Sequence, residues 1–307
     1  MITLGIDTSN YATSVALYDG ERNEVLEAKK VFLPVKDGEL GLRQNDAVFE
    51  HIKTLPTILE DISKNEAFRK IGAVGVSTKP RPIEESYMPC FLTGKMAASL
   101  IALQAQKPLI QTTHQEGHIA AALFGAEQLS LWSEDFFVFH VSGGTTDLLL
   151  VHGMKQIKQI GTSTDLYAGQ AIDRLGKLLG FPFPSGVFVS QSAQACTASI
   201  ALKEKKPVLN VSFSGIENQF TKKYQDGVLA EEICKFTLLS IAENLNAMAK
   251  AARKEYGTLP IIAAGGVMGS EIIAAYLTEK HENISFVSEK LSSDNAIGVA
   301  ILAAKRE

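Results

Sequence analysis

Two histidines are spaced for chemistry in the segment His114-Gln-Glu-Gly-His118. Residues four apart lie on one face of an α-helix, so the two imidazoles would converge at a spacing that suits one metal ion. A zinc protease needs a glutamate directly after the first histidine, but Gln115 stands there and Glu116 falls on another face. The segment therefore predicts either a metal site or two hydrogen-bonded histidines at a helix start, and it disfavours a metallopeptidase.

Two glycine-rich turns follow apolar runs, Val141-Ser-Gly-Gly-Thr-Thr-Asp147 and Ala264-Gly-Gly-Val-Met-Gly-Ser270. Glycine lets backbone N–H groups approach an anion closely, and the second turn opens a predicted helix whose first amides favour phosphate. Neither turn has Walker or Rossmann spacing. Each alone is also compatible with a plain tight turn, but together with Asp7-Thr8-Ser9 in the first hairpin they indicate a nucleotide site.

Two acids have two interpretations each. Asp173 could bind ribose hydroxyls from a helix that faces a nucleotide, or it could pair at the surface with Arg174 or Lys177. Asp294 stands just before the last predicted helix, where it could be an N-cap. Together with the two histidines, it could instead be the carboxylate ligand of a metal.

The elements that must position these residues alternate between strands and helices, which indicates the α/β class. Period-two and apolar runs predict strands at 2–7, 14–20, 25–32, 71–78, 108–112, 136–153 (a hairpin), 207–214, 259–264 and 284–287. Helical spacing predicts helices at 47–63, 91–106, 114–126, 168–180 and 215–256, with a last one after Asn295. Two strand–turn–strand openings about 130 residues apart predict a duplicated architecture.

The composition limits the class of protein. With 46% hydrophobic and 21% charged residues, the 307-residue chain is not of the disordered type. A net charge of -4 gives no general attraction to nucleic acid. The three cysteines form no CxxC pair, and the start of the chain carries no signal-peptide pattern. We therefore expect a cytoplasmic protein without a membrane segment.

The order of the motifs resembles the TsaD/Gcp (Kae-type) family, whose members transfer a threonylcarbamoyl group to an adenosine of tRNA. Seven segments carry the resemblance: IDTSNYATSVALYD, THQEGHIAAAL, HVSGGTTDLLLV, AGQAIDRLGKLLGFPFPSG, VSFSGIENQF, AAGGVMGS and SSDNAIGVAILA. The resemblance implies the two-lobed actin, sugar-kinase and Hsp70-type ATPase fold (ASKHA), with duplicated βββαβαβα-like lobes around a central cleft. It implies a first lobe of residues 1–132, joined by the C-terminal helix 295–307, and a nucleotide-binding lobe of residues 133–294.

The resemblance also implies roles for single residues. His114, His118 and Asp294 match the family's ligands for a divalent metal, iron or zinc. The positions that match the pocket for ATP, AMP or threonylcarbamoyl-AMP are Ser142, Gly143, Gly144, Thr145, Asp173, Gly186, Gly265, Gly266 and Ser270. Family members pair through the first lobe with a smaller homologue, TsaB, and with an ATPase, so we expect a TsaB-like partner or a homodimer.

The chain departs from the family pattern near the predicted chemistry. Asn10-Tyr11-Ala12 stands where the family has Cys-Asp-Glu, Thr145 stands where it has His, and Ser270 stands where it has Asn. The loop with Lys79 and Arg81 replaces a glycine-rich segment. These changes predict a divergent paralogue. It would be a metal-dependent carbamoyl or threonylcarbamoyl transferase with an adenine-nucleotide-activated donor and tRNA or another acceptor. The alternative is a nucleotide- and metal-binding protein with a regulatory or scaffold role.

Overall fold

The computed structural model describes residues 1–34, 42–287 and 295–306. The chain forms two compact units, one made of Met1–Phe124 with the C-terminal helix, and one made of the described residues from Gly125 to Val287. The lobe boundaries inferred from the family, 1–132 and 133–294, stay a prediction. Each unit is built on its own sheet.

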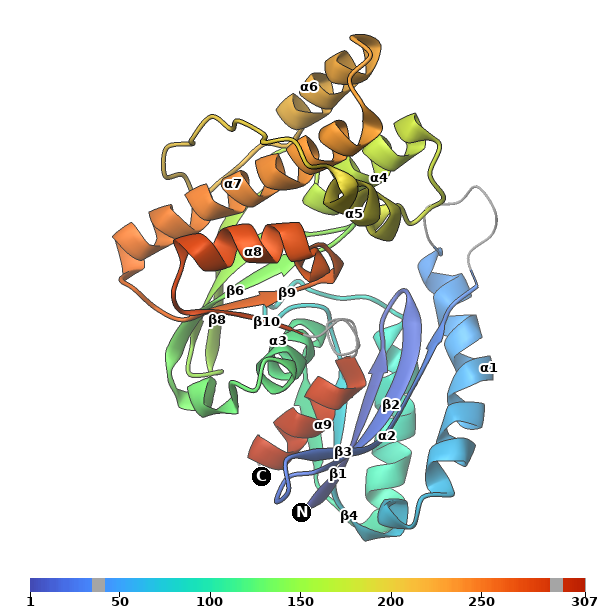
Figure 1. Cartoon of the computed structure of the whole chain (residues 1–307). Coiled ribbons are helices and arrows are strands. Elements are labelled where there is room, and N and C mark those ends of the chain that lie inside the picture. The colour runs from blue at the N-terminus through green and yellow to red at the C-terminus, as the bar shows by residue number, and fades with distance from the viewer. Residues whose placement is uncertain (35–41, 288–294, 307) are drawn as a thin grey trace. The chain divides into compact units, whose positions relative to one another are not determined.

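In the described part of the first unit, five strands form a mixed sheet in the order β3-β2-β1-β4-β5 (Figure 1). The strands are β1 (Ile2–Thr8), β2 (Ala12–Asp19), β3 (Glu24–Phe32), β4 (Ile71–Ser77) and β5 (Leu109–Thr112). β1 and β2 are antiparallel, as the predicted hairpin requires, and β1, β4 and β5 run parallel. Parallel strands end at the same edge of a sheet, so the residues that follow β1, β4 and β5 are brought together there.

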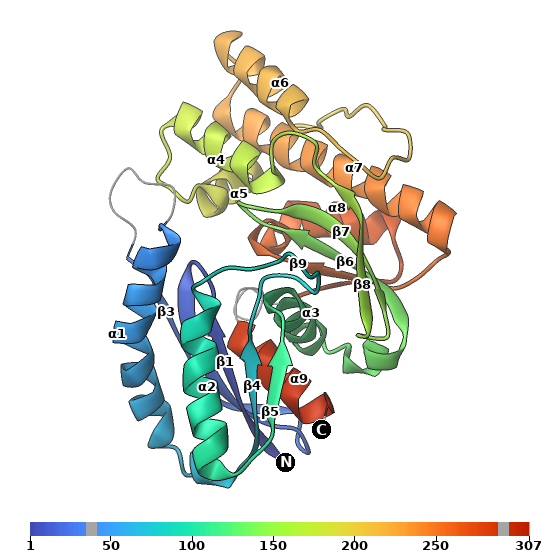
Figure 2. The same ribbon diagram turned by 180° about the vertical axis from the view of Figure 1, so that it is seen from behind.

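Helices cover both faces of this sheet. They are α1 (Gln44–Ser63), η1 (Glu66–Lys70), α2 (Phe91–Ala105), α3 (His114–Gly125) and α9 (Asn295–Arg306). Figures 1 and 2 show α9 on one face and α1 and α2 on the other.

The helices α3 and α9 touch backbone to backbone. A Cβ built at Gly298 would lie 1.8 Å from the carbonyl oxygen of Gly117, so no larger residue fits at this crossing. Gly117 lies between His114 and His118. The crossing therefore places the first turn of α3 beside the first residue of α9, Asn295.

The described part of the second unit repeats the plan, with five strands in the order β10-β9-β6-β7-β8. The strands are β6 (Asp135–Val141), β7 (Thr146–His152), β8 (Gln156–Thr162), β9 (Ile261–Ala264) and β10 (Ile284–Phe286). As in the first unit, an antiparallel hairpin is followed by parallel neighbours. The duplicated architecture that the sequence predicts is confirmed.

The helices of this unit pack on its sheet around one apolar core. They are η2 (Leu129–Ser133), α4 (Ala168–Leu179), α5 (Gly186–Ala195), α6 (Ser214–Gln225), α7 (Ala230–Tyr256), η3 (Gly266–Gly269) and α8 (Glu271–Lys280). α7 contributes much of the core because most of its side chains are buried. Among the described residues, no helix is long and apolar enough to cross a membrane.

Among the described strands and α-helices, the structure differs from the sequence prediction at three elements. The strand predicted at 207–214 is wrong, because only Val211 makes a bridge there, to Ser163. The alternation arises because Val211 and Phe213 point into the core without a ladder of hydrogen bonds. β8 and α5 were not predicted, since β8 is a largely polar edge strand and α5 follows directly on a proline-rich loop.

Candidate functional site

The helix α3 begins at His114, as predicted, because its first turn carries its own cap. The hydroxyl of Thr113 accepts from the Glu116 amide at 3.2 Å, and the Glu116 carboxylate accepts from the Thr113 amide at 2.7 Å. Glu116 also pairs with Arg306. Its carboxylate thus caps the helix start and binds Arg306, so it is not placed as the catalytic glutamate that a metallopeptidase needs.

The first turn of α3 brings the two histidines together. The ring centroids of His114 and His118 are 4.6 Å apart, with the planes at 73°. The ring of Phe91 lies against His114 with a centroid distance of 5.8 Å. The predicted convergence of the two imidazoles is therefore present.

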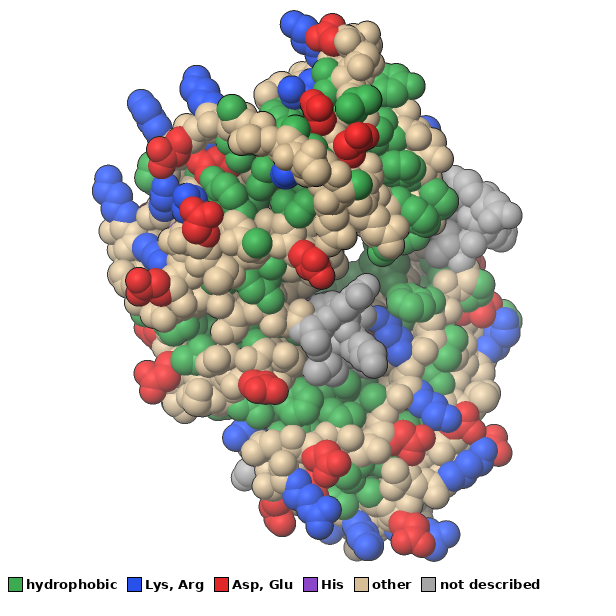
Figure 3. Space-filling model, viewed as in Figure 1, with side chains coloured by type: hydrophobic (Ala, Val, Ile, Leu, Met, Phe, Trp, Pro, Cys, Tyr) green, Lys and Arg blue, Asp and Glu red, His purple; other side chains and the backbone are tan. Residues whose placement is uncertain are grey.

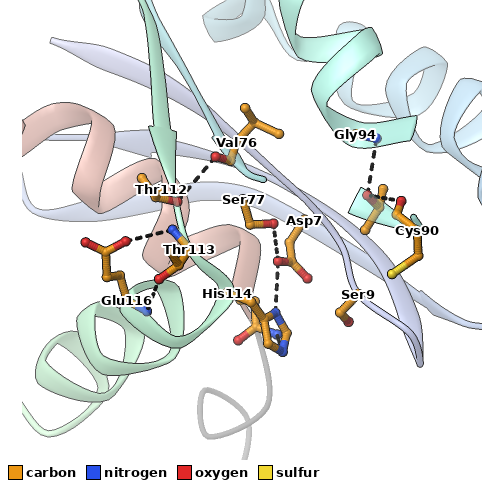
Figure 4. A network of polar contacts seen from close by, with 12 residues as sticks. Asp7, Ser9, Val76, Ser77, Cys90, Gly94, Thr112, Thr113, His114 and Glu116 are labelled. Atoms are coloured by element: carbon orange, nitrogen blue, oxygen red, sulfur yellow. Dashed lines mark hydrogen bonds and ion pairs between the residues drawn. The ribbon is translucent and has the colours of Figure 1, made fainter. Parts of the chain in front are cut away.

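Asp7 lies at the end of β1 and meets His114 across the sheet edge (Figure 4). Its Oδ1 lies 3.0 Å from His114 Nδ1 and accepts a hydrogen bond from the hydroxyl of Ser77, the last residue of β4. Three neighbouring parallel strands thus supply the cluster: β1 carries Asp7, β4 carries Ser77, and β5 leads into His114. The side chain of Asp7 is only 1% exposed.

The charge state of Asp7 follows from this environment. Burial opposes its ionisation, but the electrostatic attraction and hydrogen bond of the His114 ring and the hydroxyl of Ser77 outweigh burial, so the pKa of Asp7 lies below its ordinary value. Asp7 is therefore an ionised, acceptor-only group at neutral pH.

Two buried oxygens beside the histidines have no hydrogen-bond partner, Asp7 Oδ2 and Asn295 Oδ1. The amide Nδ2 of Asn295 lies 3.4 Å from His114 Nε2. Unpaired buried oxygens next to two imidazoles are the donor atoms that a divalent cation accepts, so these residues fit a metal.

The third predicted metal ligand, Asp294, lies outside the described residues. Within the described ranges, no group of three or more His, Cys, Asp or Glu side chains is arranged for a metal. Of the predicted trio, the structure thus brings together His114 and His118.

The turn after β1 is held by a histidine that the sequence analysis did not single out. His51 Nδ1 lies 2.7 Å from the Thr13 hydroxyl, and its Nε2 lies 2.9 Å from the carbonyl oxygen of Ser9. Burial lowers the pKa of His51 below its ordinary value. The signal was present, because His51 shares the buried face of α1 with Leu55 at helical spacing.

In the second unit, the turn between β6 and β7 is closed by its own polar groups. The Ser142 amide donates to the Thr145 carbonyl at 2.8 Å, and the two hydroxyls lie 3.1 Å apart. The threonine that replaces the family's histidine therefore stabilises the turn. A Cβ built at Gly143 or Gly144 would meet nothing within 4 Å, so the outer side of the turn is open.

This turn borders a pocket of about 510 Å³. Six of the nine predicted nucleotide residues line it: Ser142, Gly143, Asp173, Gly186, Gly266 and Ser270. Gly144, Thr145 and Gly265 are not among the lining residues.

Four lining glycines leave their Cβ positions empty, Gly143, Gly186, Gly266 and Gly269, and none of them has a positive φ. Gly265 differs, since its φ is +102° and a Cβ there would lie 2.2 Å from the Val141 carbonyl oxygen. Gly265 is required by packing, whereas the other four give a ligand room to approach the backbone.

Asp173 has a structural role at this pocket. Its Oδ1 accepts from the Ser185 amide at 2.9 Å, which fixes the start of α5. Arg174 pairs with Glu217 at 2.7 Å rather than with Asp173. Asp173 thus lines the pocket and does not form an ion pair with Arg174.

The sequence did not predict the part of the pocket that α5 lines, because α5 itself was not predicted. Gln194 of α5 donates to Glu271 of α8 at 2.8 Å, and both residues line the pocket. Phe183, in the loop before α5, also lines it and is 83% exposed. The pocket lining therefore combines the apolar side chain of Phe183, open glycines and the polar pair Gln194 and Glu271.

The segment Val211–Gly215, which includes the end of the strand expected at 207–214, is held by Asp165. The hydroxyls of Ser212 and Ser214 and the amide of Phe213 all donate to the Asp165 carboxylate. Although burial opposes ionisation, these donors lower the pKa of Asp165 well below its ordinary value. The serines therefore anchor the start of α6.

Comparison with known proteins gives the family and the fold. The TsaD family model, described as tRNA N6-adenosine threonylcarbamoyltransferase, matches residues 42–301. A tRNA N6-adenosine threonylcarbamoyltransferase from Sulfurihydrogenibium sp. (strain YO3AOP1) is 27% identical over 316 residues, which cover 100% of this chain and 90% of the relative.

Two solved structures have the same fold at low identity. The activator of 2-hydroxyisocaproyl-CoA dehydratase from Clostridium difficile, with bound ADPNP, has a TM-score of 0.58 at 13% identity, with 100% of this chain and 95% of that chain covered. A ROK family protein from Streptococcus pneumoniae TIGR4 has a TM-score of 0.57 at 9% identity, with 100% and 99% covered. The predicted ASKHA-type α/β fold is confirmed.

Proposed function

The chain belongs to the TsaD family of tRNA N6-adenosine threonylcarbamoyltransferases, and we propose that it transfers a threonylcarbamoyl group from an adenylate donor to an adenosine of tRNA. In this reaction the N6 amine attacks the carbamoyl carbon and forms a C–N bond. The bond from that carbon to the phosphate oxygen breaks, AMP leaves with the electron pair, and the amine loses a proton.

The pocket of the second unit is the observation that carries the proposal. Its volume of about 510 Å³ is in the range of small-molecule sites. The open glycines Gly143 and Gly266 would let backbone amides contact the phosphate, while Phe183 and Val187 offer apolar surface to the base. An adenylate has both kinds of group.

His114 and His118 would hold a divalent metal, iron or zinc, with Asp294 as the predicted third ligand. When bound, the metal would supply Lewis-acid polarisation of the carbamoyl oxygen. The chain's own part in the first unit is to hold the imidazoles in place, through the α3 cap and through Asp7.

Nucleotide binding is tested by filling the pocket floor. Gly266→Val should weaken AMP binding at least tenfold in calorimetric titration, because the new side chain occupies space that the backbone leaves open. Gly215→Val is the matched control, since Gly215 is equally open but lies outside this pocket. Wild-type protein that binds neither AMP nor ATP would contradict the donor half of the proposal.

The acceptor needs its own test. On the face drawn in Figure 3, acidic and basic side chains are interspersed, in keeping with the net charge of -4. We expect purified protein, given threonylcarbamoyl-AMP and unmodified tRNA, to form N6-threonylcarbamoyladenosine, detected by mass spectrometry of the digested tRNA. Donor consumed without modified tRNA would point to another acceptor. AMP binding without donor consumption would point to the regulatory role.

We also propose that a TsaB-like protein docks on the first unit. Four apolar side chains stand exposed along α2 at spacings of four, four and three residues: Leu92 (50% exposed), Met96 (57%), Leu100 (61%) and Leu103 (74%). A helix stripe of this kind is suited to pack against a partner's helices.

Light scattering tests this surface. Leu100→Glu should abolish the complex with a TsaB-like protein, whereas Phe32→Glu, at an exposed ring on β3, should leave it intact. A dimer of wild-type protein alone that Leu100→Glu dissociates would identify a second copy as the occupant instead.

A further inference from the structure

We propose that Asp7 is a positioning residue of the metal site: it holds His114 protonated at Nδ1, so that Nε2 is the nitrogen that binds the metal. The inference rests on the proposed function in one respect, namely that His114 is a metal ligand. It adds that Nε2 is the atom of His114 that binds the metal, and that Asp7 determines which nitrogen is free to do so.

The contact between the two side chains defines the tautomer. Asp7 Oδ1 lies 3.0 Å from His114 Nδ1, within hydrogen-bond distance. A carboxylate only accepts hydrogen bonds, so Nδ1 must carry the proton of a neutral imidazole. The other nitrogen, Nε2, then keeps its lone pair, and Asn295 Nδ2 lies 3.4 Å from it as a weak donor. A metal ion would replace that donor.

Asp7 can impose this geometry because it is itself held firmly. It lies on β1, which is paired on one side with β2 and on the other with β4. The hydroxyl of Ser77 donates to the same Oδ1 that faces His114. A side chain on an interior strand with a fixed partner is positioned more accurately than one on a loop.

A purely architectural role does not explain the second carboxylate oxygen. Asp7 Oδ2 is buried without a hydrogen-bond partner. An acid that served only the fold would be expected to have both oxygens satisfied, since an unpaired buried oxygen destabilises the folded state. A charge kept buried at this position is instead used on the other oxygen, where it holds the proton of His114 Nδ1.

Measurements of metal affinity distinguish a positioning role of Asp7 from a role in packing alone. Conserved carboxylate partners of metal-binding histidines typically change metal affinity by about 10- to 100-fold when they are removed. We expect Asp7→Ala to weaken Zn²⁺ binding by this factor in competition with a chromophoric chelator. Asp7→Asn, whose amide oxygen can still accept from Nδ1, should lose less.

Asp147→Ala is the matched control. Asp147 is also a buried strand acid, 4% exposed, and accepts from the Thr162 hydroxyl at 2.7 Å. It belongs to the second unit, so its loss should destabilise the protein without changing Zn²⁺ affinity. An equal loss of affinity in Asp7→Ala and Asp147→Ala would assign the effect to stability and overturn the proposal.

A second readout needs no metal. In ¹⁵N NMR spectra of metal-free protein, His114, identified by comparison with His114→Ala, should be protonated at Nδ1 in the wild type. In Asp7→Ala this preference should be lost. A wild-type His114 protonated at Nε2, or an Asp7→Ala variant with wild-type Zn²⁺ affinity, would overturn the inference while leaving metal binding intact. Wild-type protein that binds no Zn²⁺ or Fe²⁺ would overturn both.

Discussion

Acid should destabilise the second unit through one buried histidine, His281. Its side chain is 3% exposed, and its Nε2 lies 3.1 Å from Asn246 Oδ1, which makes Nε2 the protonated nitrogen. Nδ1 is buried with no partner. Adding a proton there would create a charged N–H without an acceptor. Burial, and then the charges of Arg253 and Lys250, lower the pKa of His281 to about 4.

The direction of the change in stability with pH follows from the difference between the pKa of His281 in the folded and in the unfolded state. In the unfolded chain a histidine titrates near 6.5, so below that pH the unfolded state binds a proton that folded His281 excludes until about pH 4. Stability is therefore lost as the pH falls through this window. Between pH 7.5 and pH 5.0, protonation of this histidine stabilises the unfolded state by about 2 kcal/mol. About 1.5 pH units of this interval lie below the pKa of 6.5, and each contributes about 1.4 kcal/mol.

The perturbation is His281→Gln, which keeps an N–H donor for Asn246 and removes the titrating group. The free energy of unfolding is measured in urea at both pH values by the fluorescence of Trp132, the chain's one tryptophan, which lies in the same unit. The other titrating groups are the same in the wild type and in His281→Gln, so their contributions cancel in the comparison. The wild type should lose about 2 kcal/mol more than the variant on acidification. Equal losses would refute the assignment of the low pKa to His281.

Two further contrasts test the glycine turn and the helix cap. In the same urea experiment, Gly265→Ala should lower the free energy of unfolding by about 2 kcal/mol or more, because its φ is +102° and the new Cβ would press on the Val141 carbonyl. Gly266→Ala, where the Cβ meets open space, should change it by no more than about 0.5 kcal/mol. A similar loss in both would contradict the packing argument. Glu116→Ala should cost about 1 kcal/mol in thermal unfolding followed by circular dichroism, because the Thr113 amide loses its acceptor. No change in the melting temperature would mean that the cap contributes nothing.

Local patterns predicted much of the fold. The start of α3 was predictable because Thr113 and Glu116 cap it within one turn. The two hairpins were predictable because their strands are adjacent in the chain. The strand expected at 207–214 failed, because alternation reports which side chains are buried and not whether the backbone finds a partner. α5 was missed because its small and β-branched residues follow a proline-rich loop.

The candidate site was predictable in its residue types and less so in its connections. His51 was visible on the apolar face of a predicted helix, but its partners Ser9 and Thr13 lie about 40 residues away in the chain. Asp7 and His114 are 107 residues apart. Contacts at such separation depend on strand order, which no local pattern contains.

The α/β class, the duplicated hairpins, the TsaD family and the histidine pair could all be predicted from local periodicity or from the order of short motifs. The contact of Asp7 with His114, and the different roles of Gly265 in packing and Gly266 at a pocket, are visible only in the folded chain. The physical reason is the same in each case. Parallel strands bring distant residues to one edge of a sheet, and their spacing there is set by the strand order and register of the folded chain.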